Sequence, residues 1–315
     1  MSLNELLQLY DLSDAKVSSL SENETLHTAW NLSHPFGDYI LKCHTFPPDP
    51  YQTDKLNLSC RLMAHLYAQD FPCPKPIQNT RGEWFTEYDG KNYQIFTVLH
   101  GETDWGNMTT TRVSQAGTLI GDFHRLQSDL PDVPPPQDLR ERIRGGVERI
   151  VAEWDTFNMT RSDIRDAGAE ALSLIDPLWQ KLSSLPSGLL HTDATPGNVL
   201  VDGNQLTGLI DFEVIPGALL LDFGMTAIRW AGCFDPTTEI TDLNLDWLST
   251  FLHTYTKARP LSPAEKRALK DALTLAAIWS LGRQREHRDD DPDFRLTSRS
   301  EIYIALRDLN LEDLF

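Results

Sequence analysis

Short apolar runs separated by turn residues dominate the first hundred positions. Residues 25–32 and 38–45 are rich in aromatic and aliphatic side chains, and the turn-forming stretch 33–37 between them predicts a β-hairpin. Two more strand candidates, 82–88 and 92–99, flank Asp89-Gly90, a pair that favours a tight turn. Between these hairpins, leucines recur at helical spacing over 54–69, before a proline-rich stretch at 71–76 that ends the helix. We therefore expect a first part that is mostly sheet.

From about position 100 the apolar residues recur with helical periodicity. The pattern predicts helices over 111–127, 137–155, 162–182, 245–258, 262–285 and 299–315. Two short strands, around 198–201 and 206–210, interrupt them and are joined through Asp202-Gly203-Asn204. The chain is thus predicted to have an α+β fold, with a small antiparallel-sheet lobe over 1–99 and a larger helical lobe over 100–315.

Length and composition are those of an ordinary globular enzyme. With 315 residues, 40% of them hydrophobic, the chain is long enough to build two cores. It has no run of eighteen apolar residues, and its N-terminus has neither a basic start nor a long apolar stretch, so we expect a cytoplasmic protein without a membrane segment. The four cysteines lie far apart without paired spacing, which predicts reduced core thiols instead of disulfides or a zinc site.

The charge balance narrows the range of partners. The sequence has 46 acidic and 28 basic residues, a net charge of −18. Such an excess repels nucleic acid and anionic membrane lipids at long range, so neither is an expected partner. A cationic small molecule would be attracted, although an acidic surface also serves solubility alone.

The segment from His191 to Asp211 has the residues that phosphoryl transfer requires. A tight turn at Gly203 would bring Asn198, just before the first short strand, close to Asp211, just after the second. An amide oxygen and a carboxylate suit Mg²⁺, which keeps water and substrate phosphates as its other ligands. Asp193, earlier in the same loop, is then free to accept a proton from an incoming hydroxyl.

Each candidate has a simpler structural interpretation. Asp193 and Asn198 are residue types that commonly cap turns, but a turn does not require a second acid at the end of the next strand. Lys42 lies between apolar neighbours on a predicted strand, where it either points inward toward an anion or faces solvent. For His191 and His124 we expect structural roles in place of reactive ones.

A resemblance to a known superfamily adds to these predictions. Residues 191–230, "HTDATPGNVLVDGNQLTGLIDFEVIPGALLLDFGMTAIRW", resemble the catalytic segment of the aminoglycoside phosphotransferase and choline kinase superfamily, small-molecule kinases related in fold to protein kinases. "QAGTLIGDFHRLQ" resembles the helix with a late histidine that precedes this segment, and "DYILK" resembles the strand with a phosphate-binding lysine. The likeness spans nearly the whole chain. It implies a bilobal, protein-kinase-like fold, with a nucleotide-binding N-terminal lobe and with ATP and Mg²⁺ as cofactors.

The resemblance also implies individual roles. Asp193 would be the catalytic base, Asn198 and Asp211 the Mg²⁺ ligands, and Lys42 the residue that holds the nucleotide phosphates. His191 would support the loop.

Asp222 is expected to brace that loop as well, by accepting backbone N–H groups from its own helix or from the loop. The triplet 222–224, "DFG", looks like the metal-binding triplet of protein kinases, but Asp211 ends the strand paired with that of Asn198. Asp211 is therefore the predicted metal ligand, and Glu213 stands where protein kinases have glycine.

Two features depart from the family pattern. No glycine-rich motif precedes the first hairpin, so the loop "SLSENET" would cover the phosphates with its backbone and with Ser21, Asn23 and Thr25. The helix after Lys42 has no glutamate to pair with this lysine, and Asp54 is the one acid on it. Either Asp54 pairs with Lys42, or Lys42 is held differently, or the enzyme is impaired.

The acceptor is less determined than the chemistry. Residues 58–77 and 203–213 resemble bacterial homoserine kinases of this superfamily, which implies a small amino alcohol as the hydroxyl acceptor; aminoglycoside and choline-like acceptors stay open. Candidates for a substrate wall are Trp230, Trp279, Asp289, Asp290 and Asp291, against the alternatives of core aromatics and a solvated acidic run.

Two other classes of function compete with an active kinase. A nucleotide-binding pseudokinase or scaffold would explain the missing glutamate, but it would not need Asp193, Asn198 and Asp211 together. Metal-dependent hydrolysis is weaker, because a two-metal site usually needs more His and Asp ligands than this loop offers.

Overall fold

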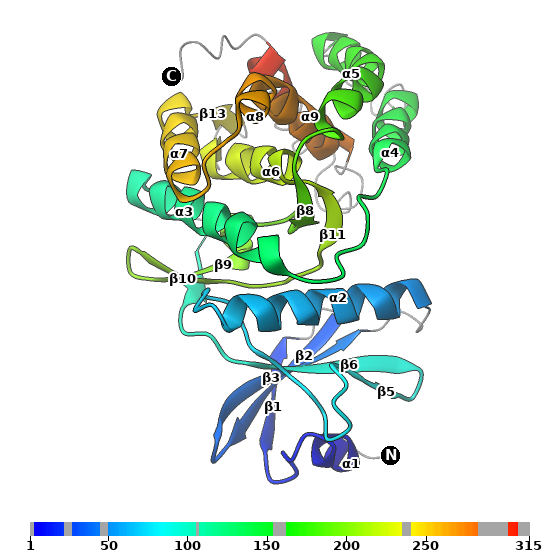
Figure 1. Cartoon of the computed structure of the whole chain (residues 1–315), viewed down its shortest axis with the longest axis vertical. Coiled ribbons are helices and arrows are strands. Elements are labelled where there is room, and N and C mark those ends of the chain that lie inside the picture. The colour runs from blue at the N-terminus through cyan, green and yellow to red at the C-terminus, as the bar shows by residue number, and fades with distance from the viewer. Residues whose placement is uncertain are drawn as a thin grey trace. The chain divides into compact units, whose positions relative to one another are not determined.

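The computed structural model describes residues 3–21, 27–44, 50–104, 107–153, 162–234, 241–282 and 302–307 (Figure 1). Its contacts divide the chain into two compact units. The first comprises Met1–Thr103 and Asn198–Val214, and the second comprises Asp104–Gly197 and Ile215–Phe315. Among the described helices, none combines the length and the apolar character needed to cross a membrane.

The first unit is an antiparallel sheet with two helices. Its helices are α1 (Leu3–Gln8) and α2 (Pro50–Tyr67). The strands of the sheet are β1 (Lys16–Ser21), β2 (His27–His34), β3 (Gly37–His44), β4 (Pro76–Ile77), β5 (Thr86–Tyr88) and β6 (Lys91–Thr97). They pair in the order β1-β2-β3-β6-β4, and β5 also pairs with β6. The predicted hairpins and helix therefore form, and α1 and β1 are additional elements that the apolar pattern did not indicate.

Alternation of side chains along β3 and β6 gives the sheet two buried faces. Leu41 and Ile95 face each other across the two strands and pack with α1 in one apolar cluster. The side chain of Gln94 lies on the other face, where its amide donates to the Cys60 thiol of α2 at 3.0 Å. The sheet is thus held between α1 and α2. The described cysteine side chains, Cys43, Cys60 and Cys73, are buried free thiols.

A second, smaller sheet joins the first unit from a distant part of the sequence. Strands β9 (Val199–Asp202) and β10 (Gln205–Leu209) form a hairpin, and β9 also pairs with β7 (Glu102–Thr103). The Leu209 amide donates to the Pro72 carbonyl at 2.9 Å. The sequence-based boundary near residue 100 grouped this hairpin with the helical part, whereas these backbone bonds group it with the first unit.

The second unit is built mainly of helices. Its helices are α3 (Thr110–Leu126), η1 (Gln127–Asp129), α4 (Arg140–Glu153), α5 (Ser162–Leu182), α6 (Leu219–Ala231), α7 (Leu245–Ala258), α8 (Pro263–Arg267) and α9 (Leu269–Gly282), and residues 302–307 are also helical. The division of the sequence into the two units falls within the short helix η3 (Pro196–Asn198), after Gly197. Two strand pairs complete it, β8 (Ser187–Leu190) with β11 (Ile215–Ala218) and β12 (Gly232–Phe234) with β13 (Thr241–Leu243).

Helices α6 and α9 form the centre of the second unit. Both are mostly apolar and buried along most of their length, which is the pattern of a helix inside a core. A Cβ on Gly224 would lie 2.8 Å from the Ala272 carbonyl oxygen, so this glycine allows α6 to approach α9 closely. The predicted helix over 262–285 is divided at Ala268: α8, which a capping box of Ser262 and Glu265 begins, ends at Arg267, and α9 begins at Leu269.

Candidate functional site

The β9–β10 hairpin confirms the predicted turn at Gly203. Asp202 pairs with Gln205 across it, and Gly203 has φ of 57°, a conformation that glycine adopts without strain. At the other end of the hairpin, the Ile210 amide donates to the Asn198 carbonyl at 2.9 Å. The backbone just before β9 therefore lies beside the backbone that leads from β10 into Asp211.

Lys42 of β3 reaches the same end of the hairpin. Its ammonium donates to the Asp211 carboxylate, with 2.7 Å between Nζ and Oδ1. The lysine is mostly covered and its neighbours on β3, Leu41 and Cys43, are buried, so an anionic partner offsets the desolvation of its charge. Lys42 therefore pairs with an acid that lies 169 positions later in the sequence. Asp54, at the start of α2, is exposed.

Helix α2 has a lysine of its own that pairs with the segment after β10. Lys55 Nζ lies 3.1 Å from Glu213 Oε2, and the Val214 amide donates to the Ser59 hydroxyl at 3.4 Å. The Glu213 amide in turn donates to the Asp211 carbonyl at 3.0 Å. These bonds fix residues 211–214 on α2. Sequence reasoning missed this contact, and the signal available was a lone Lys55 on the helix expected to carry a glutamate.

The donor set at this end of the hairpin consists of oxygen atoms. Asn198 offers a carboxamide oxygen and Asp211 a carboxylate, the ligand types that Mg²⁺ and Ca²⁺ prefer. Within the described residues, no group of three or more His, Cys, Asp and Glu side chains could enclose a metal. Two oxygen ligands of these types suit a cation that completes its shell with water and phosphate.

The loop that contains Asp193 begins where β8 ends, in the second unit. Two amides at its start donate to the carboxylate of Asp222 on α6, His191 N at 2.9 Å and Thr192 N at 2.7 Å. Farther along, the Trp230 indole donates to the Ala194 carbonyl at 2.8 Å. The backbone on either side of Asp193 is held by these bonds, and its own side chain is half-buried.

Asp222 is fully buried, and its charge is compensated by N–H groups. Burial alone would raise the pKa of this carboxyl, but the hydrogen bond from His124 and those from the loop amides outweigh it and hold the pKa below its ordinary value. His124 Nε2 lies 3.0 Å from Asp222 Oδ2. Burial lowers the pKa of the His124 imidazole despite its acidic neighbour, so His124 is neutral and donates its Nε2 proton.

The remaining sequence predictions fall at different places. Trp230 and Trp279 are buried in the helical core, which matches the structural alternative for both. Asn23, Thr25 and residues 289–291 lie outside the described residues, and Ser21 ends β1 with a side chain that is not described. The phosphate-covering role of the loop after β1 and the proposed acidic substrate wall stay predictions.

Comparisons with known proteins agree with this architecture. The family described as "Phosphotransferase enzyme family" matches residues 20–261. Solved structures with a similar fold include the amicoumacin kinase hAmiN, at a TM-score of 0.69 and 18% identity over 99% of this chain and 96% of that one. A microcompartment-associated aminopropanol kinase has a TM-score of 0.68 and 20% identity over 99% of this chain and 97% of that one. The fold is thus that of the small-molecule kinases, with a sheet-rich unit and a helical unit.

Proteins with similar sequences include several homoserine kinases. A homoserine kinase from Afipia carboxidovorans is 31% identical over 69% of this chain, and the match spans 64% of that protein. A homoserine kinase from a Bradyrhizobium species (strain BTAi1) is 28% identical over 88% of this chain and 81% of its own length. The chain belongs to the phosphotransferase enzyme family. It is a small-molecule phosphotransferase.

Proposed function

We propose that this kinase transfers the γ-phosphoryl group of ATP, with Mg²⁺, to the hydroxyl of a homoserine-like amino alcohol. The observation that carries the proposal is the contact of 2.7 Å between the Lys42 ammonium and the Asp211 carboxylate. It lies at the end of the β9–β10 hairpin opposite the turn, where the backbone of Asn198 also lies. A lysine beside a carboxylate and a carboxamide is the set needed to bind a polyphosphate together with a divalent cation.

Each side chain then has one task in the reaction. Lys42 binds the nucleotide phosphates, while Asn198 and Asp211 would hold the cation. When bound, Mg²⁺ supplies charge neutralisation at the phosphates. The Asp193 carboxylate accepts the hydroxyl proton as the acceptor oxygen forms its bond to the γ-phosphorus. The bond from that phosphorus to the bridging oxygen breaks, and ADP leaves with the electron pair.

Supporting groups keep this arrangement in place. Asp222 receives the amides of His191 and Thr192, so the loop reaches Asp193 with a fixed backbone. For Asp54, Ser21, Asn23 and Thr25 we retain the prediction that they contribute to the nucleotide site; Asp54 is exposed at the N-terminal end of α2, where it is accessible to a ligand. Most of the catalytic effect in this chemistry comes from positioning and electrostatics, so these supports bear directly on rate.

The acceptor class rests on two supports. The relatives that match most of this chain are named homoserine kinases, and one similar structure is an aminopropanol kinase, so amino alcohols recur among them. The net charge of −18 attracts amino alcohols with a net positive charge, such as aminopropanol. Homoserine carries a carboxylate beside its ammonium and so has no net charge; its support is the relatives, and on that ground we expect it or a close analogue to be the substrate.

A screen of ADP release tests the proposal. The purified chain is incubated with ATP and Mg²⁺ and, in separate reactions, homoserine, aminopropanol, ethanolamine, choline, methylthioribose, hexosamines and aminoglycosides. We expect turnover with homoserine or another amino alcohol and little with the sugars. Tight nucleotide binding without turnover of any acceptor would favour a scaffold, and phosphate release without an acceptor would favour a hydrolase.

Two matched variants identify the base. Asp193→Asn removes the proton acceptor at nearly constant volume, and we expect kcat to fall by about 10²- to 10⁴-fold. Asp202→Asn makes the same chemical change on β9, at an exposed side chain that contacts His100, and should leave kcat within about twofold of the parent. Equal activity of the two variants would remove Asp193 from the reaction.

A further inference from the structure

A chain of buried polar groups continues from Asp222 into helix α7. The Tyr255 side chain is completely buried, and its hydroxyl lies 2.8 Å from His124 Nδ1, on the opposite side of the imidazole from Asp222. The Arg259 guanidinium donates to the same hydroxyl at 3.3 Å, and at 2.7 Å to Glu265 Oε1. Hydrogen bonds thus connect five side chains between α8 and the loop that contains Asp193: Glu265, Arg259, Tyr255, His124 and Asp222.

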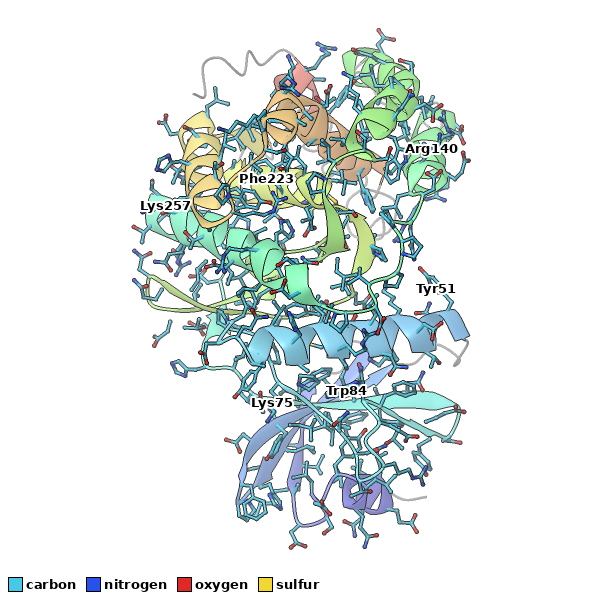
Figure 2. All side chains as sticks on the ribbon, viewed as in Figure 1. Tyr51, Lys75, Trp84, Arg140, Phe223 and Lys257 are labelled. Carbon is cyan, nitrogen blue, oxygen red and sulfur yellow. The ribbon has the colours of Figure 1, made fainter. Side chains whose placement is uncertain are left out.

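Close helix packing makes this contact possible. A Cβ on Gly121 of α3 would lie 2.9 Å from the Tyr255 carbonyl oxygen and 2.7 Å from the Ala258 Cβ, so a larger residue would push α7 away. His124 follows Gly121 by one helical turn and therefore meets Tyr255 at hydrogen-bonding distance. Phe223, next to Asp222 on α6, lies in the interior of the helical unit (Figure 2), with its ring 4.7 Å from that of Tyr255.

The direction of each hydrogen bond in this series of side chains follows from the groups at its two ends, Asp222 and Arg259. Asp222 is ionised and can only accept, so His124 must donate from Nε2, and a neutral imidazole then has an accepting lone pair on Nδ1. Arg259 can only donate, so the Tyr255 oxygen accepts from it. The Tyr255 proton is therefore directed to His124 Nδ1. Burial raises the pKa of the Tyr255 phenol, so this proton stays on the oxygen.

The outer end of the chain is anchored at the start of α8. The Glu265 carboxylate accepts from the Ser262 amide at 2.9 Å as well as from Arg259, and its amide donates to the Ser262 hydroxyl at 3.2 Å. Glu265 is 2% exposed, so its bond to Arg259 is shielded from water and is stronger than a surface ion pair. The position of Tyr255 is thus determined from both sides.

We propose that Tyr255 is a positioning residue for phosphoryl transfer. By donating to His124 Nδ1 while Arg259 and Glu265 hold its oxygen, it fixes the imidazole that keeps Asp222 on the amides of His191 and Thr192. The proposal rests on the proposed function in one respect, since it assigns Asp193 as the base that these amides position. Tyr255 itself touches neither substrate nor reacting atoms in this account.

Hydrogen exchange and steady-state kinetics of Tyr255→Phe test this role. The amides of residues 191 and 192 should exchange at least about 10-fold faster than in the parent chain, because their acceptor is held less firmly. In the same variant, kcat should fall by between about 10- and 100-fold while KM for ATP changes by less than about twofold, because a misplaced base affects the transition state more than nucleotide binding.

Tyr303→Phe is the matched control. Tyr303 is also fully buried, but its hydroxyl has no hydrogen-bond partner among the described residues, so the same atom is removed without breaking a series of bonds there. We expect parent-like exchange at residues 191 and 192 and parent-like kcat. If Tyr255→Phe does not fold, Glu265→Gln tests the same series of hydrogen bonds, because it weakens the bond between residue 265 and Arg259. Faster exchange is then expected at the same two amides.

The outcomes separate the two proposals. Unchanged exchange at residues 191 and 192 in a folded Tyr255→Phe chain, or an equal change in Tyr303→Phe, would overturn the positioning role. The exchange experiment needs no acceptor, so it decides this inference even if the parent chain turns over none of the amino alcohols, a result that would count against the proposed function alone.

Discussion

Replacing Asp222 by asparagine should destabilise the helical unit and slow catalysis at the same time. The Asp222 carboxylate accepts three N–H groups, from His124, His191 and Thr192, at 3.0, 2.9 and 2.7 Å. An asparagine can place its oxygen where two of these donors converge. Its NH₂ group then faces the third donor, the Thr192 amide, and the negative charge that strengthened all three bonds is lost.

The magnitude follows from the groups left unsatisfied. Loss of one charge-assisted hydrogen bond costs roughly 1.5–3 kcal/mol, and a buried donor without an acceptor costs roughly 1–3 kcal/mol. Since Asp222 is completely buried, solvent screening does not reduce these values, and we expect Asp222→Asn to lower the free energy of unfolding by roughly 3–5 kcal/mol. A backbone shift in the loop should also lower kcat by about 10²-fold.

Urea denaturation followed by far-UV circular dichroism measures the stability, because most of the helical signal comes from the second unit. Asp176→Asn is the matched control: this aspartate is 60% exposed, pairs with Arg144 at 2.8 Å, and its replacement should cost about 0–1 kcal/mol. Equal unfolding midpoints for the two variants would show that the bonds to Asp222 do not hold the loop, and the account of the loop would have to be abandoned.

Three further results are expected. Lys42→Met should lower kcat/KM for ATP by about 10²- to 10³-fold with little loss of melting temperature, and an unchanged kcat/KM for ATP would contradict the phosphate role. Lys55 and Glu213 lie 3.1 Å apart, so Lys55→Glu and Glu213→Lys should each reduce activity by replacing attraction with repulsion, and the double variant should recover it. A double variant as inactive as the two single changes added together would show that this ion pair does not support the site. Stability should fall as pH drops below 6.5, because burial lowers the pKa of His124 in the folded chain and the unfolded chain therefore takes up the proton first. Thermal melts over this pH range measure the effect. His124→Phe should reduce this pH dependence, and replacing the exposed His253 by glutamine should not.

Local patterns in the sequence predicted the elements that carry the site. The run of aromatic and aliphatic residues over 38–45 predicted β3, and glycine at position 203 predicted the turn that brings Asn198 toward the end of β10. These predictions succeeded because strands, helices and tight turns are encoded within a few residues. The order of the acids along the chain was also sufficient to distinguish Asp211, at a strand end, from Asp222, inside the buried helix α6.

Contacts between distant segments were not predictable in the same way. An acid on the following helix was one of three alternatives for Lys42, and its partner in the structure, Asp211, is 169 positions away. The hairpin joins the first unit through β7, a two-residue strand too short to show any periodicity. Tyr255 reads as an ordinary apolar position of α7, and its role depends on the approach of α3 at Gly121. Such pairings depend on tertiary packing, which a single sequence does not display.

The most direct test of the central claim is a phosphorus NMR spectrum of the reaction of the chain with ATP, Mg²⁺ and an amino alcohol. The account predicts a new phosphomonoester signal that grows in equal amount with ADP, is present with Asp202→Asn and is lost with Asp193→Asn. Orthophosphate in place of the phosphomonoester, or a phosphomonoester formed equally well by Asp193→Asn, would contradict it.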